Sequence, residues 1–407
     1  MVDVAIIILF ALVGNVLFKK IGLPGILGMI IAGILLGPSG FDLIDPEIQA
    51  VLKEFKTIAL IVILFRAGLG IEKKTLNQVG GPAIRMSFVP AIIEGTIVTT
   101  LSYWLLDLPF YISGMLGFII AAVSPAVVVP SMLELRDNNF GKKKGIPTLI
   151  LAGASLDDII TITIFGVFAS LASGTTANWT FVFVSVPAGI LVGAGIGVLI
   201  GFFAVWFFKK FHMRDTMKVV LFMIVAVIFY DVAEMPSIKN LIPIASLLGI
   251  MAIGFILLEK YDVLANRMAR KFNKIWVLAE ILLFVYIGTE VRISEIDSSI
   301  IGVGLLILII GLISRSLGVW ISLYGSNLNT KEKIFCMIAY WPKATVQAAM
   351  GAVPLSMIIS GQISTVSETV GQTILAIAVL SIVFTAPLGA IGIKLTGHKL
   401  LNQDLVD

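Results

Sequence analysis

Ala121-Ala122-Val123-Ser124-Pro125-Ala126-Val127-Val128-Val129-Pro130-Ser131 places two prolines inside the apolar stretch 110–134. A proline lacks the backbone N–H, so it leaves the carbonyl one turn earlier without its helical hydrogen bond. At membrane depth such a carbonyl is tolerated only where protein or a water-filled cavity satisfies it. The stretch therefore predicts a membrane helix interrupted around Ser124, Pro125 and Pro130. An ordinary proline kink is the simpler alternative.

A second apolar stretch has the same character. It reads Tyr340-Trp341-Pro342-Lys343-Ala344-Thr345-Val346-Gln347, with a proline and a charge in the middle of a spanning segment. Interrupted helices in corresponding positions of two transporter halves mark the substrate site. We therefore expect Trp341, Pro342 and Lys343 to form a second break that faces the first.

An internal repeat relates the two stretches. Leu64–Ile71 resembles Phe284–Val291 at an interval of about 220 residues, close to the interval between Ser124-Pro125 and Trp341-Pro342. Seven predicted helices fall within this interval, and because seven is odd the two halves have opposite orientations in the membrane. Inverted repeats are typical of secondary transporters. Chance similarity between apolar helices is the alternative.

The composition indicates a polytopic membrane protein. Of 407 residues, 58% are hydrophobic and only 13% are charged, which no soluble domain of this size matches. The single cysteine and two histidines argue against a disulfide framework and against a zinc or histidine-based catalytic site. The net charge of +4 does not indicate a nucleic-acid partner, because the basic residues lie in short loops between apolar runs.

We predict an all-α membrane protein with thirteen transmembrane helices, inverted repeats and two crossed interrupted helices. The first repeat is residues 1–172 (helices 1–6), residues 173–216 are a linker with helix 7, the second repeat is residues 217–396 (helices 8–13), and residues 397–407 are a cytoplasmic tail. The predicted spans are 1–18, 22–37, 57–71, 82–106, 110–134, 147–172, 178–208, 217–232, 241–258, 276–291, 299–324, 333–358 and 371–395.

The loop charges predict the orientation. Almost all basic loop residues fall on one side of these spans, and the opposite side holds only Lys53, Lys56, Lys239 and Arg292. Cytoplasmic loops carry the excess of Lys and Arg. We therefore expect the N-terminus outside and the C-terminus in the cytoplasm.

Two adjacent carboxylates, Asp157 and Asp158, lie in the middle of the apolar stretch 147–172. An ionised Asp at the bilayer centre costs about 2.5–3.5 kcal/mol on insertion scales, so the pair is expected to bind something. Neighbours on a helix point about 100° apart, so one can line a cavity while the other faces a neighbouring helix. A hydrated or cation-bound carboxylate stays charged, whereas a dry and empty one takes a proton. The pattern predicts a binding site for which a small cation and a proton compete. With Na⁺ or Li⁺ as the cation, Asp157 and Asp158 are the metal ligands.

Glu94 and Arg315 lie near the centres of two further spans that are repeat equivalents. Neither charge is expected to face lipid, so we favour an ion pair between them across the two halves. A pairing of Arg315 with Asp157 is the alternative. A buried pair is costly to break, by about 3–5 kcal/mol when one partner is removed.

Lys343 and Ser155 have less specific roles. We favour a structural role for Lys343, which neutralises the carbonyl ends of unwound backbone after Pro342, over a role in the transport chemistry itself. Ser155 is either a hydroxyl ligand for the cation or a small residue that allows close helix packing.

Several of these motifs resemble the NHA-type sodium/proton exchangers of the cation:proton antiporter superfamily. The strings that carry the resemblance are Arg66-Ala67-Gly68-Leu69-Gly70, Ser124-Pro125-Ala126-Val127-Val128-Val129-Pro130-Ser131-Met132, Gly145-Ile146-Pro147-Thr148-Leu149, Ser155-Leu156-Asp157-Asp158, Asn329-Thr330-Lys331-Glu332-Lys333-Ile334-Phe335 and Trp341-Pro342-Lys343-Ala344-Thr345-Val346-Gln347-Ala348-Ala349.

The resemblance implies an antiporter fold with a core domain, about 57–172 and 276–395, that moves against a dimerisation domain made of the remaining helices. It implies that Asp158 is the principal carrier of cation and proton, with Asp157 beside it. Arg315 would occupy the place of a lysine found in many relatives, with Glu94 as its partner. Because it lacks the long terminal extensions of animal members of this family, the chain resembles a bacterial relative, which we expect in the plasma membrane.

The residues and the resemblance together predict a homodimeric secondary antiporter that exchanges Na⁺ or Li⁺ for H⁺ by alternating access, with membrane lipids and monovalent cations as its partners and no other cofactor. A K⁺/H⁺ antiporter, a sodium-coupled solute symporter and a channel are alternatives with the same architecture. We disfavour an enzyme such as an intramembrane aspartyl protease, because it needs its two aspartates on facing helices with a shared proton.

Overall fold

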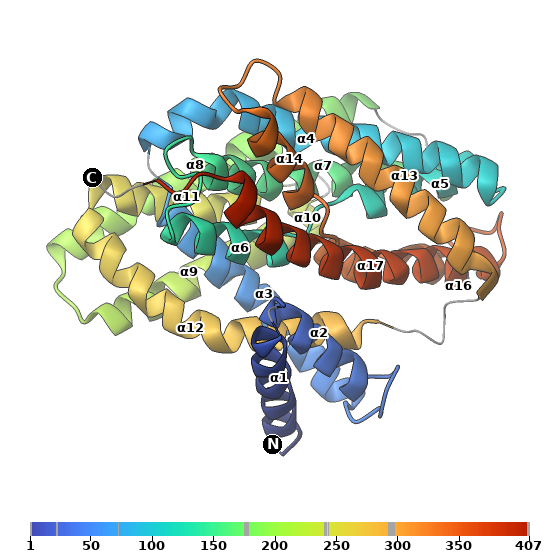
Figure 1. The fold of residues 1–407 in the computed structure, drawn as a ribbon, viewed down its shortest axis with the longest axis horizontal. Helices are drawn as coiled ribbons and strands as arrows, with labels where there is room; N and C mark the ends of the chain where they lie inside the picture. Colours follow the sequence, from blue (N-terminus) through green and yellow to red (C-terminus); the bar gives the residue numbers. More distant parts are fainter. Residues whose placement is uncertain are drawn as a thin grey trace.

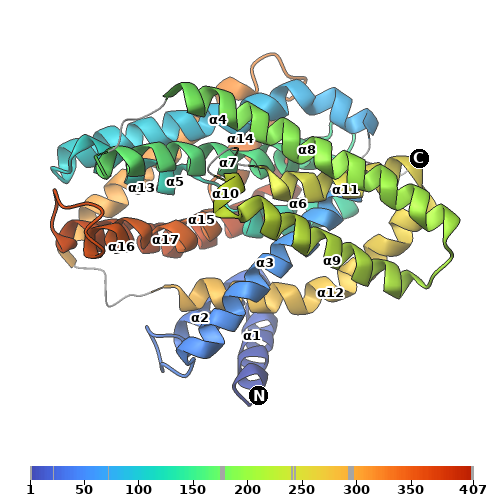
Figure 2. The same cartoon turned by 180° about the vertical axis from the view of Figure 1, so that it is seen from behind.

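The chain is an almost entirely helical bundle (Figures 1 and 2). The computed structural model describes residues 2–404 except 22, 72, 175–178, 240, 241, 243 and 292–297. The helices are α1 Val2–Lys20, α2 Gly25–Leu36, α3 Pro46–Gly68, α4 Lys73–Leu105, α5 Phe110–Ala121, α6 Pro125–Asp137, α7 Ile146–Ala172, α8 Trp179–Lys210, α9 Asp215–Glu234, α10 Pro236–Lys239, α11 Ser246–Lys260, α12 Asp262–Thr289, α13 Ser298–Ser322, α14 Thr330–Ala339, α15 Thr345–Met350, α16 Val353–Ile359 and α17 Glu368–Leu400.

Eight spans among the described residues are long and apolar enough to cross a membrane, with α5 and α6 taken together as one of them. This confirms the predicted class, whereas the count of thirteen crossings stays a prediction. Three helices begin well before their predicted spans: α3 at Pro46, α4 at Lys73 and α12 at Asp262. Hydropathy detects only the part of a helix that matches the hydrocarbon layer, and the charged first turns of these helices extend beyond it.

Both predicted interruptions are present. The helix of the first half stops at Ala121 and resumes at Pro125, and that of the second half stops at Ala339 and resumes at Thr345. Pro125 occupies the first turn of α6, where its missing N–H has no helical partner to lose. Pro130, which we expected to interrupt the helix, instead lies inside α6, so that prediction is wrong.

The second interrupted helix has an additional break that the sequence did not predict. It lies between Met350 and Val353, where α15 gives way to the short α16. Pro354 lies in the first turn of α16, and this position favours a new helix start over continuation of the old one.

The inverted repeat is visible in how four glycines pack. In each half a glycine-containing helix crosses a helix of the other half so closely that an added Cβ would collide with backbone carbonyl oxygen. The contacts are Gly68 against Met251, Gly254 against Phe65, Gly288 against Ile30 and Gly33 against Val285. The Gly68–Met251 contact corresponds to the Gly288–Ile30 contact, and the Gly254–Phe65 contact corresponds to the Gly33–Val285 contact. Equivalent residues are separated by the same interval of about 220 residues that relates the two halves of the sequence.

The helices form two groups. In one group α4 packs extensively on α5, α7 and α13, and α17 packs on α14 and α16. In the other, α2 and α3 pack on α12, α1 packs on α2, and α11 packs on α3 and α8; in Figure 1, α1, α2 and α12 lie below α17. Helices α3 and α12, which we assigned to the core domain, thus pack mainly within the second group. The predicted domain boundaries stay a prediction.

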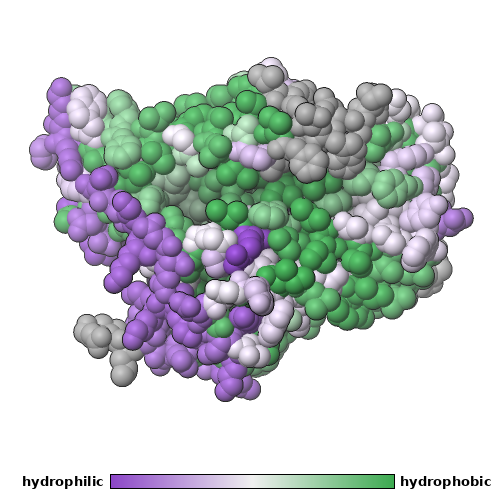
Figure 3. Space-filling model, turned by 90° about the horizontal axis from the view of Figure 1, so that it is seen from above, coloured by the Kyte–Doolittle hydropathy of each residue, from purple (hydrophilic) through white to green (hydrophobic). Residues whose placement is uncertain are grey.

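Charged side chains gather at one end of the bundle. Figure 3 shows hydrophilic residues at the end where the C-terminus lies in Figure 1, and apolar side chains over most of the remaining face. Lys144–Glu332, with 2.8 Å between Nζ and Oε2, and Arg267–Asp215, with 3.0 Å between Nε and Oδ2, are ion pairs of this end. Arg267 lies in α12, within a segment that we predicted to be a loop.

Candidate functional site

The two interrupted helices contact each other at their breaks. The Ser124 N–H donates to the Pro342 carbonyl oxygen at 2.8 Å. The Gln347 side-chain amide donates to the carbonyl oxygens of Ile119 at 2.8 Å and Ala122 at 3.0 Å. The extended backbone of both breaks is therefore satisfied by protein groups, as buried irregular backbone requires.

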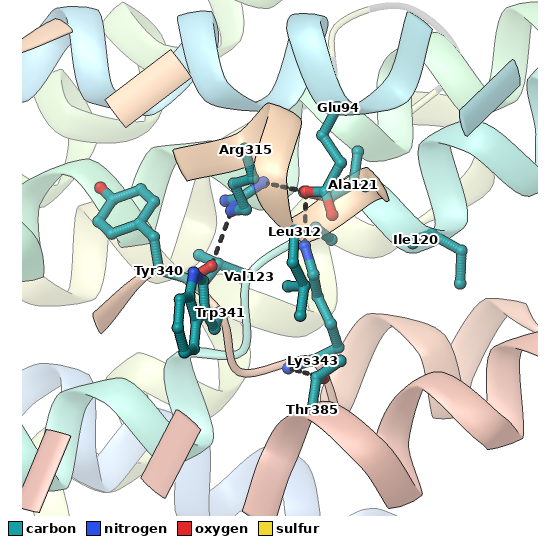
Figure 4. A network of polar contacts seen from close by, with 12 residues as sticks. Glu94, Ile120, Ala121, Val123, Leu312, Arg315, Tyr340, Trp341, Lys343 and Thr385 are labelled. Atoms are coloured by element: carbon teal, nitrogen blue, oxygen red, sulfur yellow. Dashed lines mark hydrogen bonds and ion pairs between the residues drawn. The ribbon is translucent and has the colours of Figure 1, made fainter. Parts of the chain in front are cut away.

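Arg315 from α13 lies between the ends of the half-helices (Figure 4). Its guanidinium donates to the Tyr340 carbonyl at 2.8 Å and also to the Ala121 carbonyl. Helix C-termini carry partial negative charge, so one buried cation neutralises the ends of both α5 and α14. We had assigned this role to Lys343, and the structure gives it to Arg315.

Arg315 also contacts two carboxylates. Its Nη1 lies 2.8 Å from Glu94 Oε2, and its Nη2 lies 2.8 Å from Asp157 Oδ1. The predicted Glu94–Arg315 pair is thus present in the structure. The pairing with Asp157, which we treated as its alternative, is present at the same time because the five guanidinium N–H donors serve several acceptors.

Lys343 is a further member of this cluster, not a cap for carbonyl groups. Its Nζ lies 2.6 Å from Glu94 Oε2, and its backbone N–H donates to Thr385 Oγ1 at 3.0 Å (Figure 4). The cluster of Glu94, Asp157, Arg315 and Lys343 is at most 1% exposed. With two cations and two carboxylates, its formal charge is zero.

Asp157 and Asp158 have different surroundings. Asp157 is fully buried and accepts from the Val123 N–H at 2.9 Å as well as from Arg315. Asp158 is partly buried, and its Oδ1 has no hydrogen-bond partner among the described residues. As expected from their angular separation on α7, the two carboxylates have different partners: Asp157 binds Arg315 and the backbone of the first break, whereas Asp158 Oδ1 binds neither.

Four more buried oxygens at the two breaks lack a partner in the described part of the chain. They are Ser124 Oγ, Tyr340 Oη, Thr345 Oγ1 and Gln347 Oε1. Such oxygens suit hard alkali cations. Sequence reasoning missed Thr345 and Gln347 as candidates, although both follow Pro342 in the stretch that predicted the second break.

The remaining predicted site residues have structural partners. Ser155 Oγ donates to the Leu151 carbonyl at 2.7 Å and lies 3.8 Å from Met251 Sδ of α11, so close packing is present and a ligand role stays a prediction. Trp341 Nε1 donates to Ser316 Oγ at 2.9 Å, which ties the second break to α13.

The chain matches known transporters over almost its whole length. A family model described as "Sodium/hydrogen exchanger, transmembrane" matches residues 5–398. Human sodium/hydrogen exchanger 9B2 is 34% identical over 410 residues, which cover 98% of this chain and 75% of that protein. Human sodium/hydrogen exchanger 9B1 is 30% identical over 385 residues, which cover 94% and 73%.

The fold also matches a solved structure. The sodium proton antiporter MjNhaP1 from Methanocaldococcus jannaschii, solved at pH 8, superposes with a TM-score of 0.77 over 98% of this chain and 97% of that one, at 20% identity. This likeness confirms the antiporter fold, and the family match over residues 5–398 agrees with the resemblance seen in the sequence motifs. The chain belongs to the transmembrane sodium/hydrogen exchanger family.

Proposed function

We propose that the protein exchanges Na⁺ or Li⁺ for H⁺ across the membrane, with Asp158 as the group that carries either ion. The single observation that supports this most strongly is the contrast between the two aspartates of α7. Asp157 is held by Arg315 and the Val123 N–H, whereas Asp158 has a buried oxygen with no hydrogen-bond partner in the part of the chain that the structure describes. The names of the relatives and of the structural neighbour favour sodium and protons over the alternatives.

The mechanism follows from the free-energy cost of an uncompensated charge in the membrane interior. An ionised Asp158 without a cation is too costly to move through the membrane interior. A proton neutralises it, and so does an alkali ion held by Asp158 with hydroxyl and amide oxygens of the two breaks. Because Asp158 crosses the membrane interior only with a proton or an alkali ion bound, the fluxes of the two ions are coupled.

We further propose that one proton is exchanged for each cation. The cluster around Arg315 is already neutral: the Lys343 ammonium is held by Glu94 at 2.6 Å, and an arginine does not release its proton at physiological pH. Asp158 then remains as the carboxylate whose charge changes during the cycle. Exchange by reconstituted protein should therefore be unaffected by an imposed membrane potential, and a potential-driven rate would contradict this stoichiometry.

Asp158→Asn tests the assignment of the carrier. Purified protein is reconstituted into vesicles with a trapped pH dye, and Li⁺, Na⁺ and K⁺ are added in turn. We expect ion-dependent pH changes with the unchanged protein and none with Asp158→Asn, whose thermal unfolding should stay close to that of the parent. A variant that still moves sodium against a pH gradient would overturn the assignment, and a response to K⁺ alone would favour potassium exchange.

The assembly and orientation belong to the same proposal. We propose a homodimer in the plasma membrane, with the C-terminus in the cytoplasm and the site carried by a core that moves against the dimerising helices. The gathering of basic residues at the C-terminal end supports this orientation. The relatives named above are animal proteins, so they lend no support to the bacterial source that we expected.

A further inference from the structure

A pocket lies away from the helix crossing, at the basic end of the bundle. It has a volume of about 1450 Å³ and lies between the first turn of α4, the loop that joins α6 to α7, and the segment that follows α17. Its wall is strongly basic. The cations that line it are Lys74, Arg136, Lys142, Lys143, Lys144 and Lys399.

The two acidic residues of this wall are both engaged. Glu332 pairs with Lys144 at 2.8 Å and accepts from the Asn329 N–H at 2.7 Å, which closes the cap of α14. Asp404 comes from the C-terminal segment, and its Oδ2 accepts from the Lys143 N–H at 2.6 Å. Six cations against two carboxylates leave the wall with a net positive charge.

Asp404 shows that the pocket accepts an anion. The C-terminal segment is held against the α6–α7 loop by two backbone hydrogen bonds, from the Gly141 N–H to Asn402 at 2.9 Å and from the Asp404 N–H to Asn139 at 2.9 Å. These bonds seat the Asp404 carboxylate just before α7 begins. The chain thus supplies an anion of its own to this basic wall.

Donors remain that this carboxylate does not use. Arg136 pairs through Nη2 with Asp137 Oδ1 at 3.2 Å, but its buried Nη1 has no hydrogen-bond partner among the described residues. Lys142 has only a long contact, 3.4 Å from Nζ to Asn139 Oδ1. One carboxylate cannot satisfy so many cations, whereas a phosphate offers three or more oxygens and a higher charge.

We propose that this pocket binds a multivalent phosphate group, which competes with Asp404 for the basic wall. The position, where α4 and α7 begin and α17 ends, suits the headgroup of a membrane lipid with a phosphomonoester. A soluble phosphate compound would use the same chemistry. The pocket is distinct from Asp158 and the helix crossing, so binding can be measured without ion exchange.

Two variants should change affinity in opposite directions. Lys142→Gln with Lys143→Gln removes two cations and should weaken binding at least about tenfold, because hydrogen bonds to charged groups are among the stronger ones. Asp404→Asn removes the competing charge while keeping its backbone bonds, and should strengthen binding. Lys271→Gln with Lys274→Gln, exposed cations of α12 at the same end of the molecule, is the matched control and should leave affinity unchanged.

The full-length protein is tested with two probes. Pyrophosphate is titrated calorimetrically into detergent-solubilised protein, and thermal unfolding is compared in phosphatidylcholine nanodiscs with and without a tenth of phosphatidic acid. Stabilisation by phosphatidic acid alone assigns the site to a lipid headgroup, and binding of pyrophosphate assigns it to a soluble ligand as well. The proposal is overturned if neither probe binds, or if all three variants behave like the parent with both probes.

Discussion

At the scale of single residues, the buried charges act as one unit. Glu94 accepts from both Arg315 and Lys343, and Arg315 is shared between Glu94 and Asp157. Burying four charges is costly unless each one is paired and hydrogen-bonded. Removing any member therefore leaves an uncompensated charge among side chains that are at most 1% exposed.

Glu94→Gln should lower the free energy of unfolding by about 3–5 kcal/mol, because Lys343 loses the carboxylate that it pairs with and Arg315 keeps only its pair with Asp157. Thermal unfolding of the purified protein in detergent measures this. Glu47→Gln, at an exposed position in the first turn of α3, is the control and should have little effect. Equal stability of the two variants would show that the charged cluster does not stabilise the fold.

The double change Glu94→Arg with Arg315→Glu is more informative. The stability of an isolated pair would be partly restored by exchanging its charges. In the structure, the exchange brings a glutamate next to Asp157 and an arginine next to Lys343, and like charges in a buried site repel strongly. We expect no recovery of stability relative to the single variants. Substantial recovery would show that Asp157 and Lys343 are not coupled to the pair.

At the scale of helices, the interruptions are stable because other elements satisfy their backbone. Arg315 of α13 neutralises the ends of α5 and α14, and Gln347 of α15 donates to the last carbonyls of α5. A half-helix that ends inside a membrane protein leaves carbonyl groups without partners. The end of α5 depends on Arg315 and Gln347 of the other repeat for those partners, whereas the end of α14 is satisfied by Arg315 of its own repeat.

Gln347→Leu should destabilise the crossing, because the Ile119 and Ala122 carbonyls lose their side-chain donor. The expected loss in the free energy of unfolding is about 1–3 kcal/mol, the cost of leaving buried polar groups unsatisfied, with reduced cation exchange in vesicles. Gln372→Leu, exposed on α17, is the matched control. A Gln347→Leu protein as stable as this control would show that water or another donor replaces the amide.

At the scale of the whole molecule, the two repeats interlock through their glycines. Helix α3 of the first half crosses α11 of the second at Gly68 and Gly254, and α12 of the second half crosses α2 of the first at Gly288 and Gly33. Only glycine leaves room for backbones to approach so closely, as in other packed membrane helices. The second group of helices therefore contains elements of both halves.

Gly68→Ala and Gly288→Ala should have similar effects, since they occupy repeat-equivalent contacts. Each added methyl group meets backbone carbonyl, which moves less readily than a side chain, so we expect losses of about 1–3 kcal/mol in thermal unfolding. Gly195→Ala in α8, where nothing lies within 4 Å, should be neutral or slightly stabilising because alanine is the better helix former. Tolerance of alanine at both crossings would contradict the tight packing described here.

The orientation can be tested on the intact cell. Asn327→Cys lies in the exposed loop before α14 at the basic end, and Gln362→Cys lies in the exposed turn between α16 and α17. Cys336 is buried and should react slowly. A membrane-impermeant maleimide should label Gln362→Cys in intact cells and Asn327→Cys only after permeabilisation. The reverse pattern would place the C-terminus outside.

The amino-acid sequence determined the membrane class, the two interruptions, the inverted repeat and the residues of the charged cluster. These features are local: long apolar runs must span a bilayer, a proline disfavours continuation of the helix that precedes it, and buried charges are conspicuous in apolar segments. Pro130, inside α6, shows that a proline does not always interrupt a helix. Helix starts such as Asp262 were misjudged because charged turns outside the hydrocarbon layer carry no hydropathy signal.

Only the tertiary structure decided which groups meet. Arg315 satisfies both half-helix ends and two carboxylates at once, and Lys343 contacts Glu94 instead of carbonyl groups. Asp157 is engaged, while Asp158 Oδ1 has no hydrogen-bond partner among the described residues. Sequence spacing indicates the face of a helix that a side chain occupies, but contacts between segments more than a hundred residues apart depend on how closely the helices approach. In this chain glycines and crossed breaks set that approach, because backbone atoms meet there without intervening side chains.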